Sequence, residues 1–418
     1  MSTIHIIGGK KLEGSIFVQG SKNAVLPILA ATLLVEGVSV LTNCPKIADV
    51  NEMLEILRGL GCRVWTEEEK LCILPPVKLN TRIDRKHIIS MRSSIILLGV
   101  LLSENGFVSM EYPGGCVIGE RPIDMHIMGL KKMGCEFEDD STVLCARANR
   151  LKGADITLGF PSVGATENMI LAAVKAKGIT TICGAAKEPE IVHLCDFLNR
   201  CGARIKGAGS DCIHIEGVQG LHPCEYKIPA DRIVAGTYLM SALATKGSIV
   251  LENPPVDEIS SVLQILEEMG AVIEKNNEKL YAAYERPLQA VRVETKVYPG
   301  FPTDLQSPML VLLSQAEGMG KIKETIYENR FRIVSELEKM NARLRLSGNE
   351  VTTYGQSLLK AANVRAKELR GNAALIMAGL VAEGETLVSD CQFVKRGYED
   401  ICRDLKSLGA TIYEKEES

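Results

Sequence analysis

A cysteine in a glycine-rich segment is the residue of this sequence best suited to covalent chemistry. Cys116 lies within Tyr112–Pro122, which holds three glycines and two prolines and therefore predicts a loop with conformational freedom. Arg121 follows, and a helix is expected from Ile123. Cationic neighbours and helix N-termini lower the pKa of a thiol and raise its reactivity. An inert core cysteine is the alternative, but a flexible loop is a poor place for core packing, so we favour a reactive Cys116.

Basic and polar residues recur in the loops that precede predicted helices. Helix N-termini carry unpaired N–H groups and partial positive charge, and therefore favour anions. A lone Lys or Arg in a loop is usually a solvated surface charge, but recurrence at equivalent positions favours a cleft that binds phosphate or carboxylate groups. One set of loops holds Lys22-Asn23, Arg92, Ser162-Val163-Gly164, Asp231-Arg232, Asp304 and Arg370. A second set holds Lys46, Cys116 with Arg121, Lys187, Arg330 and Arg396.

Asp304, in the segment Phe301-Pro302-Thr303-Asp304-Leu305-Gln306, is a candidate general base. The same pattern suits an Asp that caps a helix over residues 305–313, and spacing alone leaves both interpretations open. His126 is interpreted as a structural or ligand-positioning imidazole rather than an acid–base group. No Gly-x-Gly-x-x-Gly opens a helix after a strand and no Walker A motif occurs, so nicotinamide-dependent and ATP-dependent chemistry lack support.

Composition narrows the class of protein further. The 418 residues, 46% of them hydrophobic, suit two domains of about 200 residues. A formal net charge of −4 does not support a non-specific nucleic-acid binder. The first residues lack the basic and apolar regions of a signal peptide, and the apolar run 95–102 is far shorter than the roughly 20 residues that span a bilayer.

The cysteines and histidines show no metal-ligand spacing. There are 13 scattered cysteines without a Cys-x-x-Cys motif, and the 6 histidines never pair at the spacing of metal ligands. We therefore expect a reduced, cytoplasmic protein with no metal, no cofactor and no membrane partner. Most of its thiols are expected to be small core hydrophobes.

The elements that must position these residues form a sixfold repeat. A Gly or Asn followed by a small residue closes a helix and opens a strand at intervals of about 70 residues, which indicates one supersecondary unit used repeatedly. These junctions are Gly61-Cys62, Gly134-Cys135, Gly202-Ala203, Gly270-Ala271, Asn341-Ala342 and Gly409-Ala410. Each copy is interpreted as strand, loop, helix, strand, loop, helix, strand, which predicts an α/β fold.

Six copies predict three in each of two lobes, with a boundary near residue 229 and two short crossings between the lobes. In the first copy a buried helix is expected over residues 26–34 and a second helix from Asp49. The second helices of the other copies are expected at 123–133, 191–198, 260–269, 333–340 and 398–408. If the copies pack around a common axis, the basic loops gather at one end, in a cationic cleft between the lobes.

Seven motifs give the chain a resemblance, nearly end to end, to a known family. They are Gly20-Ser21-Lys22-Asn23-Ala24, Pro113-Gly114-Gly115-Cys116-x-Ile118-Gly119-x-Arg121-Pro122, Ser162-Val163-Gly164-Ala165-Thr166, Glu188-Pro189-Glu190-Ile191-Val192, Phe301-Pro302-Thr303-Asp304, Glu328-Asn329-Arg330-Phe331 and Arg396-Gly397-Tyr398-Glu399. The chain resembles the UDP-N-acetylglucosamine 1-carboxyvinyltransferases, which are enolpyruvyl transferases. The Cys-loop and Lys-Asn motifs are highly specific for this family.

The resemblance implies a two-lobed inside-out α/β barrel of six βαβαββ repeats, three per lobe around a pseudo-threefold axis. Residues 22–229 would form the UDP-sugar-binding lobe that carries the Cys loop. Residues 1–21 and 230–418 would form the catalytic lobe, the first 21 residues crossing over to complete it.

The implied reaction transfers enolpyruvyl from phosphoenolpyruvate to the 3′-hydroxyl of UDP-N-acetylglucosamine and releases phosphate, the first committed step of peptidoglycan synthesis. It runs by addition and elimination through a tetrahedral ketal. By motif match, Cys116 is the acid and can also form a covalent adduct, and Asp304 lies at the attacking hydroxyl. The residues implied to hold phosphoenolpyruvate are Lys22, Arg121, Arg330 and Arg396, with Asn23 orienting the intermediate. Those implied to bind the UDP-sugar are Arg92, Arg121, Pro122, Ile123, Asp124, Met125, Ser162, Val163, Gly164 and Ile326. Glu368 and Arg370 complete the expected site.

Four positions depart from the family pattern. Phe160 stands where many members have a basic residue, Glu368 replaces a usual Asp, and Lys395 and Val234 occupy commonly acidic positions. Because the key catalytic residues remain, we interpret these changes as those of a second paralogue rather than a dead enzyme. Two alternatives stay open: enolpyruvyl transfer to shikimate 3-phosphate by a family that lacks the Cys loop, and a non-catalytic UDP-sugar-binding paralogue.

Overall fold

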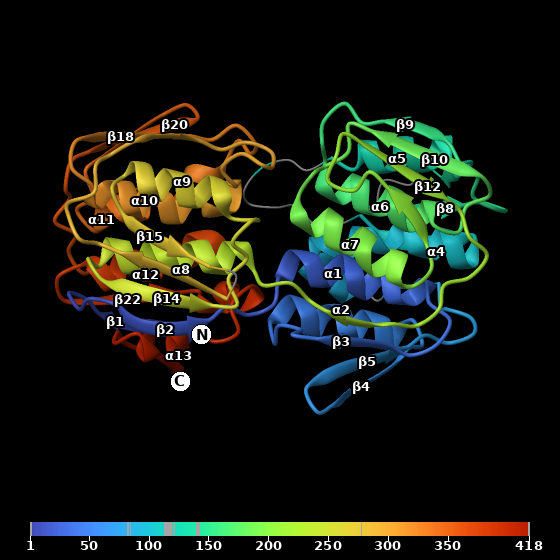
Figure 1. Cartoon of the computed structure of the whole chain (residues 1–418), viewed down its shortest axis with the longest axis horizontal. Coiled ribbons are helices and arrows are strands. Elements are labelled where there is room, and N and C mark those ends of the chain that lie inside the picture. Colours follow the sequence, from blue (N-terminus) through green and yellow to red (C-terminus); the bar gives the residue numbers. More distant parts are fainter. Residues whose placement is uncertain are drawn as a thin grey trace. The chain divides into compact units, whose positions relative to one another are not determined.

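The computed structural model describes residues 2–81, 83, 85–112, 119, 122–138, 143–276 and 278–416. Contacts within it divide the chain into two compact units. Among the described residues, the C-terminal unit combines 2–19 and Gly119 with 230–416, and the N-terminal unit combines 20–112 with 122–229. In Figure 1 the C-terminal unit contains the yellow-to-red elements together with the first two, blue strands.

Strands and helices alternate along both units, which confirms the predicted α/β class. The strands of the N-terminal unit are β3 (Ser39–Thr42), β4 (Arg63–Glu67), β5 (Lys70–Leu74), β6 (Phe107–Glu111), β7 (Glu136–Glu138), β8 (Val143–Arg147), β9 (Asp155–Thr157), β10 (Ile179–Cys183), β11 (Arg204–Lys206), β12 (Cys212–Glu216) and β13 (Glu225–Lys227). Those of the C-terminal unit are β1 (Ser2–Ile7), β2 (Glu13–Phe17), β14 (Ser248–Glu252), β15 (Val272–Lys275), β16 (Lys279–Ala283), β17 (Arg292–Glu294), β18 (Met319–Lys323), β19 (Leu344–Ser347), β20 (Glu350–Tyr354), β21 (Asn363–Arg365), β22 (Glu385–Ser389) and β23 (Thr411–Glu416).

The helices lie between these strands. Those of the N-terminal unit are α1 (Lys22–Ala31), α2 (Ala48–Gly59), α3 (Arg85–Ser90), α4 (Leu97–Asn105), α5 (Asp124–Lys132), α6 (Val163–Ala173) and α7 (Pro189–Arg200), with short 3₁₀ turns η1 (Thr32–Leu34) and η2 (Arg92–Ile96). Those of the C-terminal unit are α8 (Arg232–Ala244), α9 (Ser260–Glu268), α10 (Gln306–Gln315), α11 (Val334–Lys339), α12 (Leu369–Val381) and α13 (Ile401–Ser407), with 3₁₀ turns η3 (Thr303–Leu305), η4 (Arg330–Ile333) and η5 (Cys391–Arg396).

One pairing pattern recurs in the sheets. Within the described residues there are six sheets, and none closes into a barrel. Five of them have four strands, with one parallel pairing followed by two antiparallel pairings. Their orders are β9-β10-β12-β11, β13-β3-β5-β4, β2-β14-β16-β15, β17-β18-β20-β19 and β21-β22-β1-β23, and the sixth sheet is β6-β8-β7.

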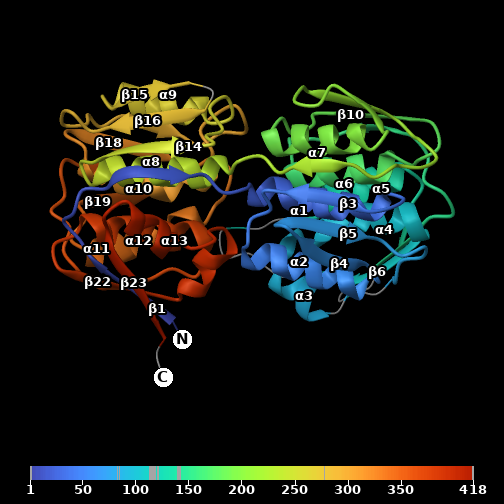
Figure 2. The same cartoon turned by 60° about the horizontal axis from the view of Figure 1, so that its bottom comes forward.

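The first two strands of the chain belong to sheets of the C-terminal unit. β1 pairs with both β22 and β23, and β2 runs parallel to β14. Figure 2 shows these blue strands among the yellow and red elements of that unit. The amide of Gln19 then anchors the end of this segment, because Nε2 donates to the carbonyl of Gly397 and Oε1 accepts from the N–H of Glu399.

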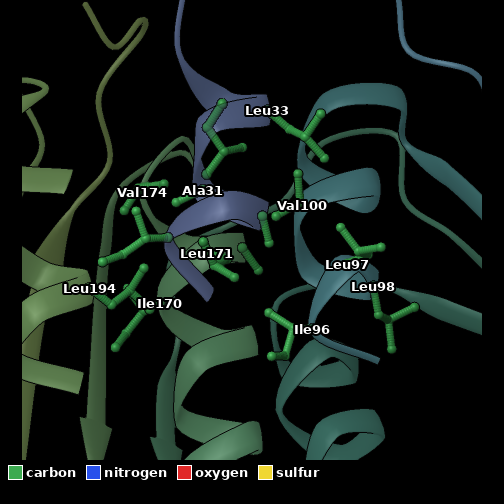
Figure 3. Close-up of a cluster of buried hydrophobic side chains, with 14 of the residues drawn as sticks. Ala31, Leu33, Ile96, Leu97, Leu98, Val100, Ile170, Leu171, Val174 and Leu194 are labelled. Carbon is green, nitrogen blue, oxygen red and sulfur yellow. The ribbon is translucent and has the colours of Figure 1, made fainter. Parts of the chain in front are cut away.

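Six helices are apolar on nearly every side and are buried along almost their whole length: α1, α4, α6, α8, α10 and α12. A helix without a polar face must lie inside the protein. Figure 3 shows side chains from α1, η2, α4, α6 and α7 converging in the N-terminal unit. In the C-terminal unit α8, α10 and α12 pack on one another in a second core.

The second helices of each copy have one apolar side and cover these cores. The helix predicted over 123–133 is α5, that over 191–198 is α7, and that over 260–269 is α9. The remaining two, α11 and α13, begin at Val334 and Ile401 and are shorter than predicted, and 3₁₀ turns over residues 330–333 and 391–396 come before them. These turns carry Arg330 and Arg396.

The prediction that the thiols are reduced is wrong for one pair. Cys183 and Cys212 form a disulfide, because they face each other in the antiparallel register of β10 and β12 with Cα atoms 4.4 Å apart. Such a close spacing is typical of a non-hydrogen-bonded antiparallel pair. Among the free thiols of the described chain, six are buried, namely Cys62, Cys72, Cys135, Cys195, Cys201 and Cys391. Cys116 lies outside the described residues.

Neither a membrane span nor a metal cluster is found in the part of the chain that the structure describes. None of its helices combines the length and apolarity that a bilayer crossing needs. No three His, Cys, Asp or Glu side chains of that part are grouped so as to hold a metal ion.

Gly217 is packed closely against the backbone, so we expect a substitution there to destabilise the protein. A Cβ atom there would collide with the carbonyl oxygen of Ala176. We expect Gly217→Ala to lower the free energy of unfolding by about 1–3 kcal/mol, the usual cost of overpacking. Gly59, the last residue of α2, has open space around it, so Gly59→Ala is a matched control that should be neutral or stabilising by up to ~1 kcal/mol. Urea unfolding of both variants checks this, and equal stabilities would contradict it.

Candidate functional site

The residues predicted to act in catalysis or binding fall into two sets, one in each unit. Asp304, Ile326, Arg330, Glu368, Arg370 and Arg396 belong to the C-terminal unit. Lys22, Asn23, Arg92, Pro122, Ile123, Asp124, Met125, Ser162, Val163 and Gly164 belong to the N-terminal unit. Cys116 and Arg121 lie outside the described residues. Each set is described within its own unit.

In the C-terminal unit, one carboxylate is held by two arginines. Asp304 lies in η3 at the start of α10, and its Oδ1 accepts from Nη2 of Arg330 at 2.7 Å. Its Oδ2 accepts from Nε and Nη2 of Arg370, at 3.1 and 2.8 Å. The side chains of Arg330 and Arg370 are only 2% and 5% exposed, whereas that of Asp304 is 27% exposed. The carboxylate therefore bridges two buried cations and reaches the surface itself.

Both arginines stay charged because of their carboxylate partners. Burial opposes the charge of Arg330, but the carboxylates of Asp304 and Glu368 outweigh it and the pKa of Arg330 is raised. Burial likewise opposes the charge of Arg370, and Asp304 outweighs it, so the pKa of Arg370 is also raised. The two guanidinium groups thus share Asp304, and the carboxylates of Glu368 and Asp231 act on them from nearby.

Two N–H groups of this cluster have no acceptor in the described residues. They are Nε of Arg330 and Nη1 of Arg370, and both are buried. A buried donor without a partner costs about 1–3 kcal/mol of desolvation, and such groups commonly await a ligand, ion or water. Because these donors belong to cationic side chains, they favour an anion as the ligand of this cluster.

A buried glutamate fixes the segments on either side of Asp304 and Arg330. Glu324 is 2% exposed, and its Oε2 accepts from the hydroxyl of Thr303 at 2.8 Å. Its Oε1 accepts from the hydroxyl of Thr295 and from the backbone N–H of Ile326 at 2.9 and 2.7 Å. The half-buried Ile326 is thereby held in a turn that follows β18. Sequence reasoning missed Glu324, whose role depends on contacts far apart in the chain.

The end of η5 packs beside the start of α12. Arg396 is half-buried, and the following Gly397 lies so close to the side chain of Leu369 that a Cβ atom would collide with it. Tyr398 is fully buried, and its hydroxyl donates to Thr237 of α8 at 2.8 Å. Burial, offset in part by the charge of Arg370, raises the pKa of Tyr398 to about 12. This packing positions Arg396 next to the helix end that carries Arg370.

Glu368 caps α12 rather than projecting from it. Its carboxylate accepts from the backbone N–H groups of Arg370, at 2.7 Å, and of Gly371. A carboxylate at a helix N-terminus satisfies donors that the helix leaves open and complements its dipole. Asp304, in contrast, is not the N-cap of α10, which is Leu305. The structure therefore does not support the N-cap interpretation of Asp304. Its carboxylate instead accepts from the guanidinium groups of two arginines.

In the N-terminal unit, Lys22 and Asn23 begin α1 after the N-cap Ser21. Nζ of Lys22 forms an ion pair of 2.8 Å with Oδ2 of Asp49, in the first turn of α2. Both side chains are shielded, at 15% and 5% exposure. Burial of a charge requires a partner, so Asp49 is what allows a cation to sit at this helix end. Sequence reasoning identified Asp49 only as the start of a helix.

A second polar group of this unit surrounds the N-terminus of α6. Ser162 is its N-cap, with Oγ accepting from the N–H of Ala165 at 3.4 Å, and Val163 and Gly164 form its first turn. The imidazole of His126, on α5, lies against Gly164. Burial and the positive charge of the nearby Arg92 lower the pKa of His126 to about 4. Arg92, His126 and Ser162-Val163-Gly164 are thus brought together from η2, α5 and α6.

Hydrogen bonds fix the tautomer of His126. Oδ1 of Asn168 accepts from the N–H of Gly99 at 2.7 Å, so Nδ2 of Asn168 is the atom that faces Nδ1 of His126 at 2.8 Å. Nδ2 also donates to the carbonyl of Ile95 at 2.9 Å. An amide nitrogen only donates, so Nδ1 of the neutral imidazole accepts and Nε2 carries the proton. The start of α6 therefore faces a further N–H donor, contributed by His126.

The remaining predicted binding residues begin α5. Pro122 and Asp124 are exposed, and Ile123 and Met125 are half-buried and pack against the core of the unit. Asp124 lies in the first turn of α5 and partly offsets the effect of Arg92 on the pKa of His126. These residues therefore border the same α6 terminus.

The interpretation of loop cations as solvated charges holds for some positions and is wrong for others. Lys46 is 76% exposed and Lys187 36% exposed, each with a surface carboxylate partner. Arg330, Arg370 and Lys22 are buried or nearly so. The cations that the fold shields are those at or next to the ends of the buried helices.

Three neighbouring glutamates form a further polar group beside α6. Glu167 and Glu190 are each 4% exposed, and Glu188 precedes α7. Burial raises the pKa of Glu167 well above its usual range, and the charges of Glu190 and Glu188 add to the effect. Glu188 and Glu190 belong to one of the predicted motifs, whereas Glu167 carried no signal in the sequence.

Comparison with known sequences identifies relatives along nearly the whole chain. Residues 6–405 match the family described as EPSP synthase (3-phosphoshikimate 1-carboxyvinyltransferase). UDP-N-acetylglucosamine 1-carboxyvinyltransferase 2 of Caldanaerobacter subterraneus subsp. tengcongensis is 45% identical over 413 residues, which cover 99% of each chain. UDP-N-acetylglucosamine 1-carboxyvinyltransferase of Halothermothrix orenii is 44% identical over 412 residues, again 99% of each chain.

Solved structures share the fold at lower identity. The enolpyruvyl transferase NikO from Streptomyces tendae aligns with a TM-score of 0.90 and 23% identity over 99% of this chain and 98% of that one. EPSP synthase from Acinetobacter baumannii aligns with a TM-score of 0.79 and 19% identity over the full length of both chains. At these identities the likeness shows the fold alone.

His126 generates a prediction on pH. Its pKa of about 4 lies below the ordinary value of 6.5, so between these values the unfolded chain takes up a proton that the folded chain does not. Stability should therefore fall as the pH drops from 6.5 towards 4, by on the order of 3 kcal/mol for this group. An NMR titration of the His126 ring, assigned with His126→Gln, checks the pKa. Urea unfolding across the same range should show a smaller loss in His126→Gln. A ring that titrates near 6.5 would contradict the prediction.

Proposed function

The chain belongs to the EPSP synthase family of carboxyvinyltransferases, and from that membership we propose that it transfers enolpyruvyl from phosphoenolpyruvate to the 3′-hydroxyl of UDP-N-acetylglucosamine, releasing phosphate. The observation that carries this proposal is the match, over nearly the full length of both chains, to relatives named for that reaction. The reaction is the first step committed to peptidoglycan synthesis.

The proposed architecture is a two-lobed inside-out α/β barrel with three βαβαββ units in each lobe. Residues 22–229 would be the UDP-sugar-binding lobe and residues 1–21 with 230–418 the catalytic lobe. Two observations support this architecture. The same strand order recurs from sheet to sheet, and the helices are buried while the sheets of the described residues stay open at their edges. In the proposed enzyme both lobes supply residues to one site.

For phosphoenolpyruvate, the proposed ligands are Lys22, Arg121, Arg330 and Arg396. The two guanidinium groups at Asp304, and the Nε–H of Arg330, which has no acceptor among the described residues, support an anion at this place. Fixed cations stabilise the charge that develops when addition and elimination occur, and they do so without reorganisation at the moment of reaction. Asn23, which follows Lys22, would orient the tetrahedral intermediate.

The proposed chemistry needs one acid and one acceptor. The Cys116 thiol would give its proton to the methylene carbon of phosphoenolpyruvate while the sugar hydroxyl oxygen bonds to the neighbouring carbon. Asp304 would take the hydroxyl proton, since an ionised carboxylate is an acceptor and its oxygens are partly exposed. Loss of a methyl proton and of phosphate then restores the double bond. Arg330 and Arg370 hold Asp304 in place for this role.

For the UDP-sugar, the proposed ligands are Arg92, Arg121, Pro122, Ile123, Asp124, Met125, Ser162, Val163, Gly164 and Ile326. The α6 N-terminus presents backbone N–H groups suited to a diphosphate. The adjacent Nε2–H of His126 adds a neutral donor, which does not depend on pH above about 4. Glu368 and Arg370 complete the site, Glu368 by fixing the start of α12.

The four departures from the family pattern have structural settings that suit a working enzyme. Lys395 forms an ion pair of 2.7 Å with Glu414, so its side chain does not displace Arg396, the next residue of η5. Val234 is fully buried inside α8, and Glu368 keeps the capping role that a shorter acid would have. Phe160 is 45% exposed and is the departure positioned to change contacts with a ligand. A second paralogue with altered nucleotide affinity fits these features.

Two rival functions remain testable: enolpyruvyl transfer to shikimate 3-phosphate, and UDP-sugar binding without catalysis. We expect phosphate release from phosphoenolpyruvate when UDP-N-acetylglucosamine is the acceptor, and none with shikimate 3-phosphate. Binding of the UDP-sugar without phosphate release would instead support the non-catalytic paralogue.

The Cys116 thiol should be the site of alkylation. We expect Cys116→Ser to abolish covalent labelling by an epoxide phosphonate such as fosfomycin, because the thiolate is the nucleophile. The control is Cys145→Ser, a half-buried thiol of the same unit, which should label like the parent chain. Intact-mass measurement reads out the adduct. Undiminished labelling of Cys116→Ser would place the reactive thiol elsewhere.

We expect Arg396 to contribute to the binding of phosphoenolpyruvate and not to that of UDP-N-acetylglucosamine. Loss of a charge-assisted hydrogen bond costs about 1.5–3 kcal/mol, so Arg396→Ala should raise the KM for phosphoenolpyruvate about 10- to 100-fold. The KM for UDP-N-acetylglucosamine should change much less. Arg365→Ala, which removes an exposed arginine of β21 in the same unit, is the matched control. Equal effects of Arg396→Ala on both substrates would refute its assignment.

A further inference from the structure

Two thiols meet at one end of α7, away from the residues assigned above. Cys201 ends that helix and Cys224 directly precedes β13, and their Sγ atoms are 3.3 Å apart. Cys201 is fully buried, whereas Cys224 is half-buried between the exposed Pro223 and Glu225. One thiol of the pair is thus within reach of a reagent and the other is not. Figure 1 shows α7, in green, within the N-terminal unit.

The backbone holds the two thiols together. The N–H of His222 donates to the carbonyl of Cys201 at 2.9 Å, and the N–H of Val40 in β3 donates to the carbonyl of Cys224 at 3.1 Å. Beside them, the rings of Phe197 and Tyr226 pack edge to face with centroids 5.6 Å apart. The contact between the sulfur atoms is therefore built into the packing of α7 against β13.

The two thiols differ in acidity. The hydrogen bond from Cys201 and the positive charge of Arg200 lower the pKa of Cys224. The same hydrogen bond, together with burial, raises the pKa of Cys201. Cys195, on the same helix, is buried and its pKa is raised to about 12. Cys224 is accordingly the nucleophile of the pair, and Cys195 is an inert thiol for comparison.

We propose that Cys201 and Cys224 form a redox-active dithiol, which a low-molecular-weight disulfide such as oxidised glutathione converts into an intramolecular disulfide. The proposal is independent of the transferase function. A nearby precedent in the chain is the Cys183–Cys212 disulfide, which ties β10 to β12 in the same repeat copy.

The reaction proceeds by two exchanges. The Cys224 thiolate attacks one sulfur of oxidised glutathione, the disulfide bond of glutathione breaks, and one glutathione leaves as thiolate, which takes up the proton of Cys201. The Cys201 sulfur then attacks Sγ of Cys224 and expels the second glutathione. Overall two cysteine thiols are oxidised to one disulfide, and one glutathione disulfide is reduced to two thiols.

Peptide mapping tests the pairing directly. The chain is reduced, exposed to excess oxidised glutathione, quenched with N-ethylmaleimide and digested without reductant. Cys212 and Cys224 share a tryptic peptide, so trypsin is followed by cleavage after glutamate, which cuts at Glu216 between them. We expect the peptide that begins at Cys201 to be linked to the peptide that carries Cys224, and the peptide of Cys195 to be alkylated.

Single variants separate the two roles. In Cys201→Ser, Cys224 should retain glutathione as a stable mixed disulfide, because the resolving thiol is gone. In Cys224→Ser, Cys201 should remain a thiol, because the accessible partner is missing. Cys195→Ser is the matched control on α7 and should form the same link as the parent chain. Cys224 of the parent chain recovered as a free thiol, or as a lasting mixed disulfide, would overturn the proposal.

Thermal unfolding provides a second readout. A disulfide across this 23-residue separation restricts the unfolded chain, so the oxidised parent should unfold at a temperature several degrees above the reduced parent. Because oxidation also forms Cys183–Cys212, the comparison is made with oxidised Cys224→Ser, which should lack the part of the shift due to the new link. Equal shifts in the two chains would contradict a native Cys201–Cys224 bond.

Discussion

The burial of six helices without a polar face is the constraint on which the rest of the structure depends. Such helices must lie inside a core, so their sides carry few charged groups, of which the buried Glu167 of α6 is one. Only the ends of these helices leave the apolar core, and helix N-termini have backbone N–H donors that require partners. Lys22, Ser162, Asp231 and Glu368 stand at or directly before the start of one of these helices, and Arg92 and Asp304 lie in the 3₁₀ turns that lead into α4 and α10. The packing of the helices therefore places these polar and charged residues at helix ends.

Charge compensation decides which of these ends hold a permanent cation. Lys22 is shielded and has Asp49 within 2.8 Å, and Arg330 and Arg370 share Asp304. Without these carboxylates the cost of removing the cations from water would exceed what the local packing supplies. The same two ion pairs of Asp304 therefore have two effects. They keep both arginines charged, and they hold the partly exposed carboxylate in a fixed orientation. Where the carboxylate partner is itself exposed, as for Lys46 and Glu69 near α2, the cation stays in solvent.

Features that local patterns encode were accessible from the sequence. Apolar periodicity and glycine punctuation predicted the helices found as α5, α7 and α9 and the α/β class of the chain. Family resemblance directed attention to helix starts that the structure places in defined polar groups, as at Asp304 and Ser162. These predictions succeed because helix formation and helix termination depend on neighbouring residues.

Features that depend on register or distant packing were not accessible. The Cys183–Cys212 disulfide follows from the pairing of β10 with β12, and no spacing rule for cysteines points to it. Asn168 fixes the tautomer of His126 across 42 residues, and Glu324 links Thr295, Thr303 and Ile326 through a side chain that resembles any other glutamate in the sequence. The helices predicted over 333–340 and 398–408 begin later than expected, at Val334 and Ile401, after the η4 and η5 turns that carry Arg330 and Arg396.

The exceptions to ordinary burial rules occur in the same places as the predicted function. Arg330, Arg370, His126 and Glu167 are ionisable groups that are nine-tenths or more buried, and each lies at a helix start or packs against one. In the C-terminal unit two buried arginines share Asp304, whereas beside α6 three glutamates gather and the pKa of Glu167 is raised by burial. The same scaffold thus accepts buried ionisable groups of either sign, because its stability comes from the apolar helix sides. Natural proteins accept such locally unfavourable groups mainly where function requires them. The arginine cluster is the one that favours an anion, because two of its buried donors have no acceptor among the described residues.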